Sequence, residues 1–266
     1  MHSPRKRFGQ HFLHDPKVIQ RIIHAVAPRP EDELLEIGPG TGVLTEPLLG
    51  ATGRLTAIEV DRDLAGHLEH RFAASGLHLL RGDILDFDFM RSPCERPWRV
   101  VGNLPYNLST PLIFRLLAAG SALEDIHIML QREVAERMAA GPHQRQYGRL
   151  SVMVGLSAVV EILFHVGPGA FRPPPKVESS VVRLRPRPQP SAPIPSLAQF
   201  SATVRIAFAQ RRKTLRKIFS GRLREDDFAR CGIAPQSRPE NLSVADFACL
   251  SRCLSGTAVV THNACG

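Results

Sequence analysis

Short apolar runs alternate with segments of helical spacing along the first 130 residues. Leu64, Leu68 and Phe72 recur four residues apart, and GVLTEPLLG and STPLIFRLLAA also have the spacing of helices. The apolar runs between the helices have the length and composition of buried strands: ELLEIG, RLTAIEVD, LHLLRGD, WRVVGN and DIHIMLQ. This alternation predicts an α/β fold with a parallel sheet and helices on both faces.

Further elements are expected on either side of this region. DPKVIQRIIHAVA predicts a helix, because Asp15 is a suitable N-cap and Pro16 stands at the first helical position. A second helix is expected near Tyr147–Val159. The runs EILFHVG and VESSVVRLRP follow it and predict two strands that close the sheet, one of them antiparallel.

The segment RPRPQPSAPIPS contains five prolines and predicts an extended linker. A basic, helical region follows it, and the tail after Leu254 shows no periodicity. We therefore expect a first domain over residues 1–186 that begins with a basic segment, a linker over 187–196, and a small helical domain over 197–266.

Composition narrows the class of partner. Lys and Arg total 34 against 25 acidic residues, so the net charge is +9 and favours a polyanion, either nucleic acid or an anionic membrane surface. No run of about 18 apolar residues is present, and the basic N-terminus lacks the apolar core of a secretory signal. The five cysteines include no C-x-x-C pair, so we expect free thiols in the cytosol and no metal site.

A glycine-rich loop, EIGPGTG at Glu36–Gly42, follows the first strand and opens a helix. It matches neither the dinucleotide-binding fingerprint nor the P-loop. Glu59, 17 positions after Gly42, ends the next strand, where a carboxylate accepts hydrogen bonds from a ribose. The following two strands end at Asp83 and Asn103. Four consecutive strands thus end, at the ligand-binding edge of the sheet, in Gly38, Glu59, Asp83 and Asn103. For Asp83 alone, a helix cap is the alternative.

The order of motifs resembles one family. RKRFGQHFL, EIGPGTGVLT, AIEVD, GD, NLPY and FRPPPKVESSV occur as in the ribosomal RNA adenine N6-dimethyltransferases, from about Arg5 to Leu184, and the likeness continues in RIAFAQRRKTLRK. The resemblance implies a Rossmann-like class I methyltransferase fold and S-adenosylmethionine (SAM) as methyl donor. It also implies a substrate: two adjacent adenosines in a hairpin near the 3′ end of 16S rRNA, in a small-subunit ribosomal particle.

The resemblance also assigns donor-binding residues. It implies that Gly38 lines the methionine part of SAM, that Glu59 binds the ribose and that Asp83 binds the adenine amino group. Leu13 and His11 match positions that close over the donor, although the family more often has Asn where His11 stands. An exposed loop histidine is the alternative for His11.

The NLPY loop, Asn103–Tyr106, then acquires a chemical role. The adenine N6 lone pair is delocalised into the ring, and acceptors aimed at its hydrogens would localise it. The Asn103 side-chain oxygen and the Leu104 carbonyl are the expected acceptors, with donor contact a secondary role for Asn103. The target base must be swung out of its stack, and Tyr106 is expected to stack on it. Phe171 matches the family's second aromatic residue and is expected on the other face, unless it is a core residue.

A basic run near the C-terminus is the expected RNA anchor. Val204, Phe208, Leu215 and Phe219 predict one amphipathic helix, and cations lie off its apolar stripe. Phosphate contacts by such cations would hold RNA without reading its bases. The expected phosphate-binding residues are Arg211, Arg212, Lys213, Arg216 and Lys217.

Two other functions remain open from the sequence. A large-subunit (23S) rRNA methyltransferase of the macrolide-resistance type shares most of these motifs. A non-catalytic RNA-binding assembly factor on a methyltransferase scaffold would be expected to lose the donor loop or NLPY, and both are present.

Overall fold

The computed structural model describes residues 11–90, 96–106 and 109–256, and divides into two compact units. The first comprises Met1–Ala135 and Val159–Pro186, and the second comprises Glu136–Ala158 and Arg187–Gly266. The predicted boundary at residue 186 thus recurs, but residues 136–158 pack with the C-terminal region. The roles assigned to the domains stay a prediction.

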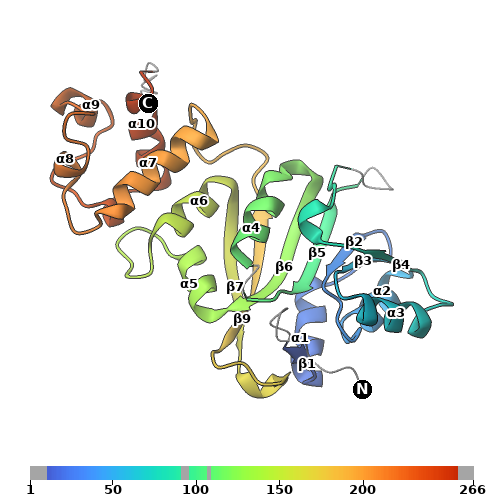
Figure 1. Cartoon of the computed structure of the whole chain (residues 1–266). Helices are drawn as coiled ribbons and strands as arrows, with labels where there is room; N and C mark the ends of the chain where they lie inside the picture. The colour runs from blue at the N-terminus through green and yellow to red at the C-terminus, as the bar shows by residue number, and fades with distance from the viewer. Residues whose placement is uncertain (1–10, 91–95, 107–108, 257–266) are drawn as a thin grey trace. The chain divides into compact units, whose positions relative to one another are not determined.

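A seven-stranded sheet forms the first unit (Figure 1). Its order is β4-β3-β2-β5-β6-β9-β7. Strands β2 to β6 are parallel and β9 runs antiparallel to β6, which confirms the predicted α/β class and an antiparallel strand near its end. The strands are β2 (Glu33–Ile37), β3 (Leu55–Glu59), β4 (Leu77–Arg81), β5 (Trp98–Asn103), β6 (Leu123–Gln131), β7 (Ala158–Val166) and β9 (Ser179–Pro186).

Helices flank this sheet at the predicted places. They are α1 (Pro16–Val26), α2 (Thr45–Thr52), α3 (Arg62–Arg71) and α4 (Ser109–Ala118), and α5 (Arg132–Ala139) follows β6 (Figure 1). The Asp15 carboxylate caps α1 by accepting hydrogen bonds from the amides of Lys17 and Val18, with Pro16 at the first helical position. The sequence patterns missed α5.

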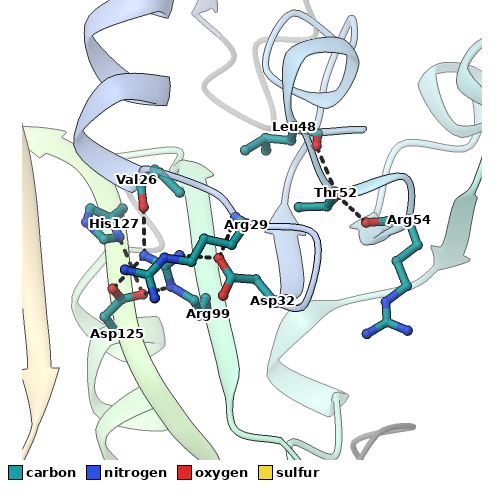
Figure 2. Close-up of polar contacts among 9 residues, drawn as sticks. All are labelled: Val26, Arg29, Asp32, Leu48, Thr52, Arg54, Arg99, Asp125 and His127. Carbon is teal, nitrogen blue, oxygen red and sulfur yellow. Dashed lines mark hydrogen bonds and ion pairs between the residues drawn. The ribbon is translucent and has the colours of Figure 1, made fainter. Parts of the chain in front are cut away.

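A buried ionic cluster ties α1 to the start of β5 and β6 (Figure 2). Arg99 donates to both carboxylate oxygens of Asp125 at 3.1 and 2.9 Å, to the carbonyl of Val26 at 2.7 Å, and to Asp32. Burial alone would raise the pKa of Asp125, but the neighbouring His127 imidazole, with Nδ1 3.6 Å from the carboxylate, and the hydrogen bonds from Arg99 outweigh it and lower that pKa to about 2. The cluster therefore depends on the single guanidinium.

The second unit is helical and has its own apolar core. It contains α6 (Arg149–Ser157), α7 (Leu197–Ala209), α8 (Leu215–Ile218), α9 (Glu225–Arg230) and α10 (Val244–Leu254). Phe200, Phe219 and Phe247 are fully buried at its centre. Leu156 of α6 belongs to the same core, which explains why residues 136–158 join this unit.

The predicted single basic helix is wrong, because the chain breaks between α7 and α8. Gln210 ends α7, and Lys213 donates its amide to the Gln210 carbonyl at 2.8 Å in the turn that follows. The amides of Leu215 and Arg216 then bond to the carbonyls of Ser237 and Pro235, both at 2.9 Å. The apolar stripe is nevertheless buried, apart from Phe208, which packs against the same core.

The proline-rich segment, residues 187–196, contains neither helix nor strand but bends repeatedly, and it is attached to the second unit, so it is not the extended linker that was expected. The Arg187 amide donates to the Ser157 carbonyl at 2.7 Å, and the Ser191 amide donates to the Leu156 carbonyl at 2.9 Å. Ala192 is 7% exposed and lies in the core of the unit. The segment therefore packs along α6.

The expectation of free thiols is wrong for two of the cysteines. Cys231 and Cys249 form a disulfide, and Cys253 is free. Cysteines 94 and 265, the predicted basic N-terminal segment and most of the predicted tail lie outside the described residues. Within the described ranges, no helix has the length and apolar character needed to cross a bilayer.

Candidate active site

A cavity of about 310 Å³ opens at the carboxyl ends of β2, β3 and β5. Ligands of open α/β sheets bind at this edge. The structure brings together here all but one of the residues predicted for donor binding and catalysis. The predicted residues that line the cavity are His11, Leu13, Gly38, Glu59, Asp83, Asn103, Leu104 and Tyr106.

The glycine loop forms one wall of the cavity. Gly38, Gly40 and Gly42 all have positive φ angles, of 64°, 59° and 82°, which glycine adopts without steric cost. No protein atom lies within 4 Å of the place where a Cβ on Gly38 would stand. The loop backbone is thus exposed to whatever fills the cavity.

Glu59 is held rigidly beside this loop. Its two carboxylate oxygens accept hydrogen bonds from the amides of Asp61, at 2.9 Å, and Gly40, at 3.1 Å. Burial raises the pKa of Glu59, and these two amide hydrogen bonds oppose the shift. Each oxygen retains an acceptor position, so the carboxylate can still receive two hydroxyl groups from a ligand.

Three further lining residues were not assigned a role from the sequence. Glu36 is deeply buried; burial raises its pKa to about 7, the Thr45 hydroxyl bond at 2.7 Å opposes this, and the charge of Glu59 adds to it. Val60 is 46% exposed, and Ile84 also lines the cavity. For Val60 and Ile84, the sequence signal that could have found them is position. Each directly follows one of the acids predicted at the strand ends, Glu59 and Asp83.

Asp83 is a helix cap, the alternative considered from the sequence, and its position leaves the predicted contact with adenine open as a prediction. Its carboxylate caps a short 3₁₀ turn, Ile84–Asp86, by accepting from the Leu85 amide at 2.9 Å, and the residue also lines the cavity. The cap fixes the side chain at the rim of the site.

The Asn103 side chain is oriented by the N-terminal strand. Its amide nitrogen donates to the His11 carbonyl at 3.1 Å, which leaves the side-chain oxygen as an acceptor. Leu104 is 2% exposed, and its amide donates to the Met129 carbonyl at 3.3 Å. The loop is therefore fixed at both residues predicted to hold the target amine.

Tyr106 is held at both ends. Its hydroxyl bonds to the Ser179 hydroxyl at 2.7 Å, and its ring stacks on His11 with centroids 5.6 Å apart and planes 28° from parallel. The His11 Nδ1 donates to the Pro173 carbonyl at 2.7 Å. His11 is thus not a free loop residue, because it connects the NLPY loop to the segment that begins at Pro173.

Phe171 differs from the expectation. It lies in β8 (Phe171–Arg172), which pairs antiparallel with β1 (Phe12–Leu13), and Leu13 stands opposite Phe171. The Phe171 side chain is 2% exposed and packs in the core of the first unit with Leu13 and Leu44, but it is not itself among the residues that line the cavity. In this structure Phe171 positions β1, which carries Leu13 to the cavity.

The predicted RNA-binding residues lie in the second unit. Arg212, Lys213 and Lys217 are exposed. Arg211 bonds to Glu240 at 2.7 Å and to the Arg145 carbonyl at 3.0 Å, while Arg216 pairs with Glu225. Three of the five cations thus extend into solvent, and the other two are shared with acids.

Comparison with known proteins decides the family. Residues 1–255 match the family model for ribosomal RNA adenine dimethylases. The chain belongs to this family. It is 53% identical over 253 residues to the ribosomal RNA small subunit methyltransferase A of Nitrosococcus oceani, covering 94% of this chain and 96% of that one. The enzyme of the same name from Marinobacter nauticus is 48% identical over 257 residues, 96% of this chain and 93% of that one.

Two solved structures extend the likeness to the fold. A dimethyladenosine transferase from Plasmodium falciparum has a TM-score of 0.76 and 27% identity, covering 90% of this chain and 96% of that one. The 23S rRNA methyltransferase ErmE has a TM-score of 0.71 and 25% identity, covering 92% and 99%. The predicted fold and enzyme class are confirmed: this rRNA adenine dimethylase is a methyltransferase that acts on ribosomal RNA.

Proposed function

We propose that this dimethylase transfers methyl groups from SAM to N6 of two adjacent adenosines near the 3′ end of small-subunit rRNA, within a ribosomal particle. The main support is the cavity, which joins a glycine loop and Glu59 to the NLPY loop. The relatives that share about half of its residues over most of both chains are named for the small subunit, which favours that substrate over 23S rRNA.

The cavity suits SAM in three ways. The exposed backbone at Gly38 leaves room for the methionine part, and the acceptors of Glu59 suit a ribose. Asp83 lines the same cavity and supplies an acceptor for an adenine amino group, and apolar Val60 and Ile84, which also line it, suit the faces of a ring. Bound SAM would supply an electrophilic methyl group on its sulfonium.

The chain's own contribution is to position the target nitrogen. The Asn103 oxygen and the Leu104 carbonyl accept the two N6 hydrogens, which draws the lone pair out of the adenine ring. Such positioning is worth several kcal/mol in a near-attack geometry, about 7–11 at most. No strong base is required, because the methylated amine is acidic and loses its proton to water.

His11 stacks on one face of the Tyr106 ring. Two arrangements fit the geometry. The extruded adenine displaces the imidazole, or it enters on the opposite face and the imidazole supports the tyrosine ring from behind. In either case Tyr106 supplies the stacking surface, and the Ser179 hydrogen bond keeps its ring in place.

Glu59→Ala is expected to weaken donor binding by about 1.5–3 kcal/mol, roughly 10- to 150-fold, because two ribose hydroxyls lose a charged acceptor. Calorimetry with S-adenosylhomocysteine measures this loss directly. Glu46→Ala is the matched control, because that carboxylate pairs with Arg71 on the surface and does not line the cavity. Equal affinities of the parental chain and Glu59→Ala would remove Glu59 from the donor site.

Replacing Arg212, Lys213, Arg216 and Lys217 by Gln is expected to weaken binding to rRNA and flatten its salt dependence. Each lost phosphate contact lowers the slope of log affinity against log salt by about 0.7–0.9. Arg216 is expected to contribute least, because Glu225 already shares its charge. The measurement is a salt titration of binding to small-subunit particles.

The control for this experiment removes the same charge from paired arginines of the first unit. An unchanged slope for the C-terminal variant, or an equal change for the control, would mean that the four cations are not phosphate contacts. The control replaces Arg54, Arg81, Arg132 and Arg183, each of which pairs with a glutamate.

The substrate is tested through the product. Dimethylation removes both donors from the Watson–Crick edge of adenine, so reverse transcriptase stops there. RNA from a strain that lacks the gene is compared with RNA from the complemented strain. Stops are expected on complementation at two adjacent adenosines near the 3′ end of small-subunit rRNA. Stops in large-subunit rRNA instead would favour the 23S activity, and rescued growth without stops would favour an assembly factor.

A further inference from the structure

Three cysteines of the second unit lie together, although they are separated in the sequence. Cys231 follows α9, and Cys249 and Cys253 are one turn apart on α10. Cys231 and Cys249 are joined, and the free Sγ of Cys253 lies 3.8 Å from the Sγ of Cys231. All three sulfurs lie within 4.8 Å of one another. We call Cys231, Cys249 and Cys253 the thiol cluster.

The thiol cluster borders an open hollow. Cys253 is half-buried and lines this hollow together with Arg222, Arg224, Arg230 and Asp227. The Cys253 Sγ also lies 3.9 Å from the Asp227 carbonyl. Cys253 is thus accessible to a small ligand from the hollow. Burial raises the pKa of its thiol, and the charges of Arg230 and Arg252 oppose this shift.

The distances between the sulfurs distinguish two possible uses of the thiol cluster, thiol–disulfide exchange and metal binding. Thiol–disulfide exchange requires the attacking sulfur in line with the disulfide, which would put the Sγ atoms of Cys253 and Cys249 about 6 Å apart. They lie within 4.8 Å, so Cys253 stands beside the disulfide rather than behind it. This compact triangle does not favour exchange.

A triangle of sulfurs is the arrangement that a metal ion with thiolate ligands requires. Zinc–sulfur bonds are about 2.3 Å, so the sulfurs of a tetrahedral site lie about 3.8 Å apart. The pair Cys231 and Cys253 already has this separation, 3.8 Å. The pair Cys231 and Cys249 reaches it once the disulfide is reduced and the two sulfurs separate to ordinary contact.

We propose that the reduced thiol cluster binds one Zn²⁺ ion through the thiolates of Cys231, Cys249 and Cys253. The fourth position faces the hollow and takes a water molecule. Three thiolates and Zn²⁺ leave one negative charge, which the arginines of the hollow offset. The proposal goes against the sequence-based expectation of no metal, which rested on the missing C-x-x-C spacing.

The Cys231–Cys249 disulfide must be reduced before zinc binds, and this step requires a reductant. Two thiol molecules of a cellular reductant give up two electrons and two protons, become one disulfide, and convert the Cys231–Cys249 bond into two thiols. Zinc then displaces three protons from the three thiols. The disulfide and the zinc site are therefore alternative states of the same residues.

The test uses the full, untagged chain with Cys94 and Cys265 replaced by Ser, so that only the thiol cluster contributes thiols. The protein is reduced with a phosphine, which takes up the oxygen of water as the disulfide gains two hydrogens, and is titrated with Zn²⁺ against a chromophoric chelator. One equivalent of zinc is expected to bind and to protect all three thiols from alkylation, as counted by mass spectrometry.

Cys253→Ser, made in the chain that already has Cys94 and Cys265 replaced by Ser, keeps Cys231 and Cys249 and removes the third proposed ligand. It is expected to weaken zinc binding at least about 100-fold, more than the usual loss of a supporting residue. Absence of stoichiometric zinc, or equal affinity in Cys253→Ser, would overturn the proposal. If that variant does not fold, the alkylation pattern of the chain with the intact cluster decides, because unprotected thiols at saturating zinc also overturn it.

Discussion

The Asn103→Ala variant is expected to lose methyl transfer by at least 100- to 1,000-fold while donor affinity stays within about tenfold. The Asn103 oxygen is fixed as an acceptor because its amide nitrogen donates to the His11 carbonyl. Alanine removes the acceptor that localises the N6 lone pair. The Leu104 carbonyl remains, but one acceptor cannot fix both hydrogens of the amine.

The measurement pairs a single-turnover methylation assay with calorimetry on S-adenosylhomocysteine. Donor affinity serves as the internal control for folding, because the cavity proposed to hold the target amine is also the one proposed to bind the donor. Pro168→Ala is a further control, since this residue starts a 3₁₀ turn and does not line the cavity. Dimethylation by Asn103→Ala at near the parental rate would contradict the proposed mechanism.

The Arg99→Met variant is expected to lower the free energy of unfolding by about 3–5 kcal/mol, because it leaves Asp32 and Asp125 buried without their common partner. Urea denaturation measures the loss. Arg81→Met is the matched control, because its pair with Glu69 lies on the surface, and it is expected to change stability little. A loss for Arg99→Met no larger than for Arg81→Met would show that the buried cluster tolerates an unpaired carboxylate.

The same cluster predicts a pH dependence. The folded-state pKa of Asp125 is lowered from 3.8 to about 2, so its contribution to stability is present above about pH 4 and is lost as the pH falls toward 2. In Arg99→Met this acid-dependent loss is expected to shrink, because the folded state no longer favours the ionised carboxylate as strongly. Urea midpoints between pH 2 and pH 5 for both chains test the difference.

The sheet and most of the candidate site follow from local patterns. Parallel strands are short apolar runs, and their carboxyl ends meet at one edge, so Gly38, Glu59, Asp83 and Asn103 were placed together without any knowledge of side-chain positions. These features depend on residues close in sequence and on a general rule of sheet topology.

Other features depend on contacts between distant residues and leave no local signal. The two-residue pairing of β1 with β8 fixes Leu13 and buries Phe171, and no periodicity is visible in so short a ladder. The break between α7 and α8 is set by the carbonyls of Pro235 and Ser237, some 20 residues downstream. The thiol cluster likewise forms only after α9 and α10 pack.

The chain passes between the two units three times, near residues 136, 158 and 187, and this has a consequence for synthesis on the ribosome. Apolar residues of α6, such as Val152 and Leu156, are made before Phe200 and Phe247, which bury them. At about 5–20 residues per second, this interval lasts several seconds. During that time α6 exposes its apolar face, so a chaperone is expected to bind the nascent chain at this helix.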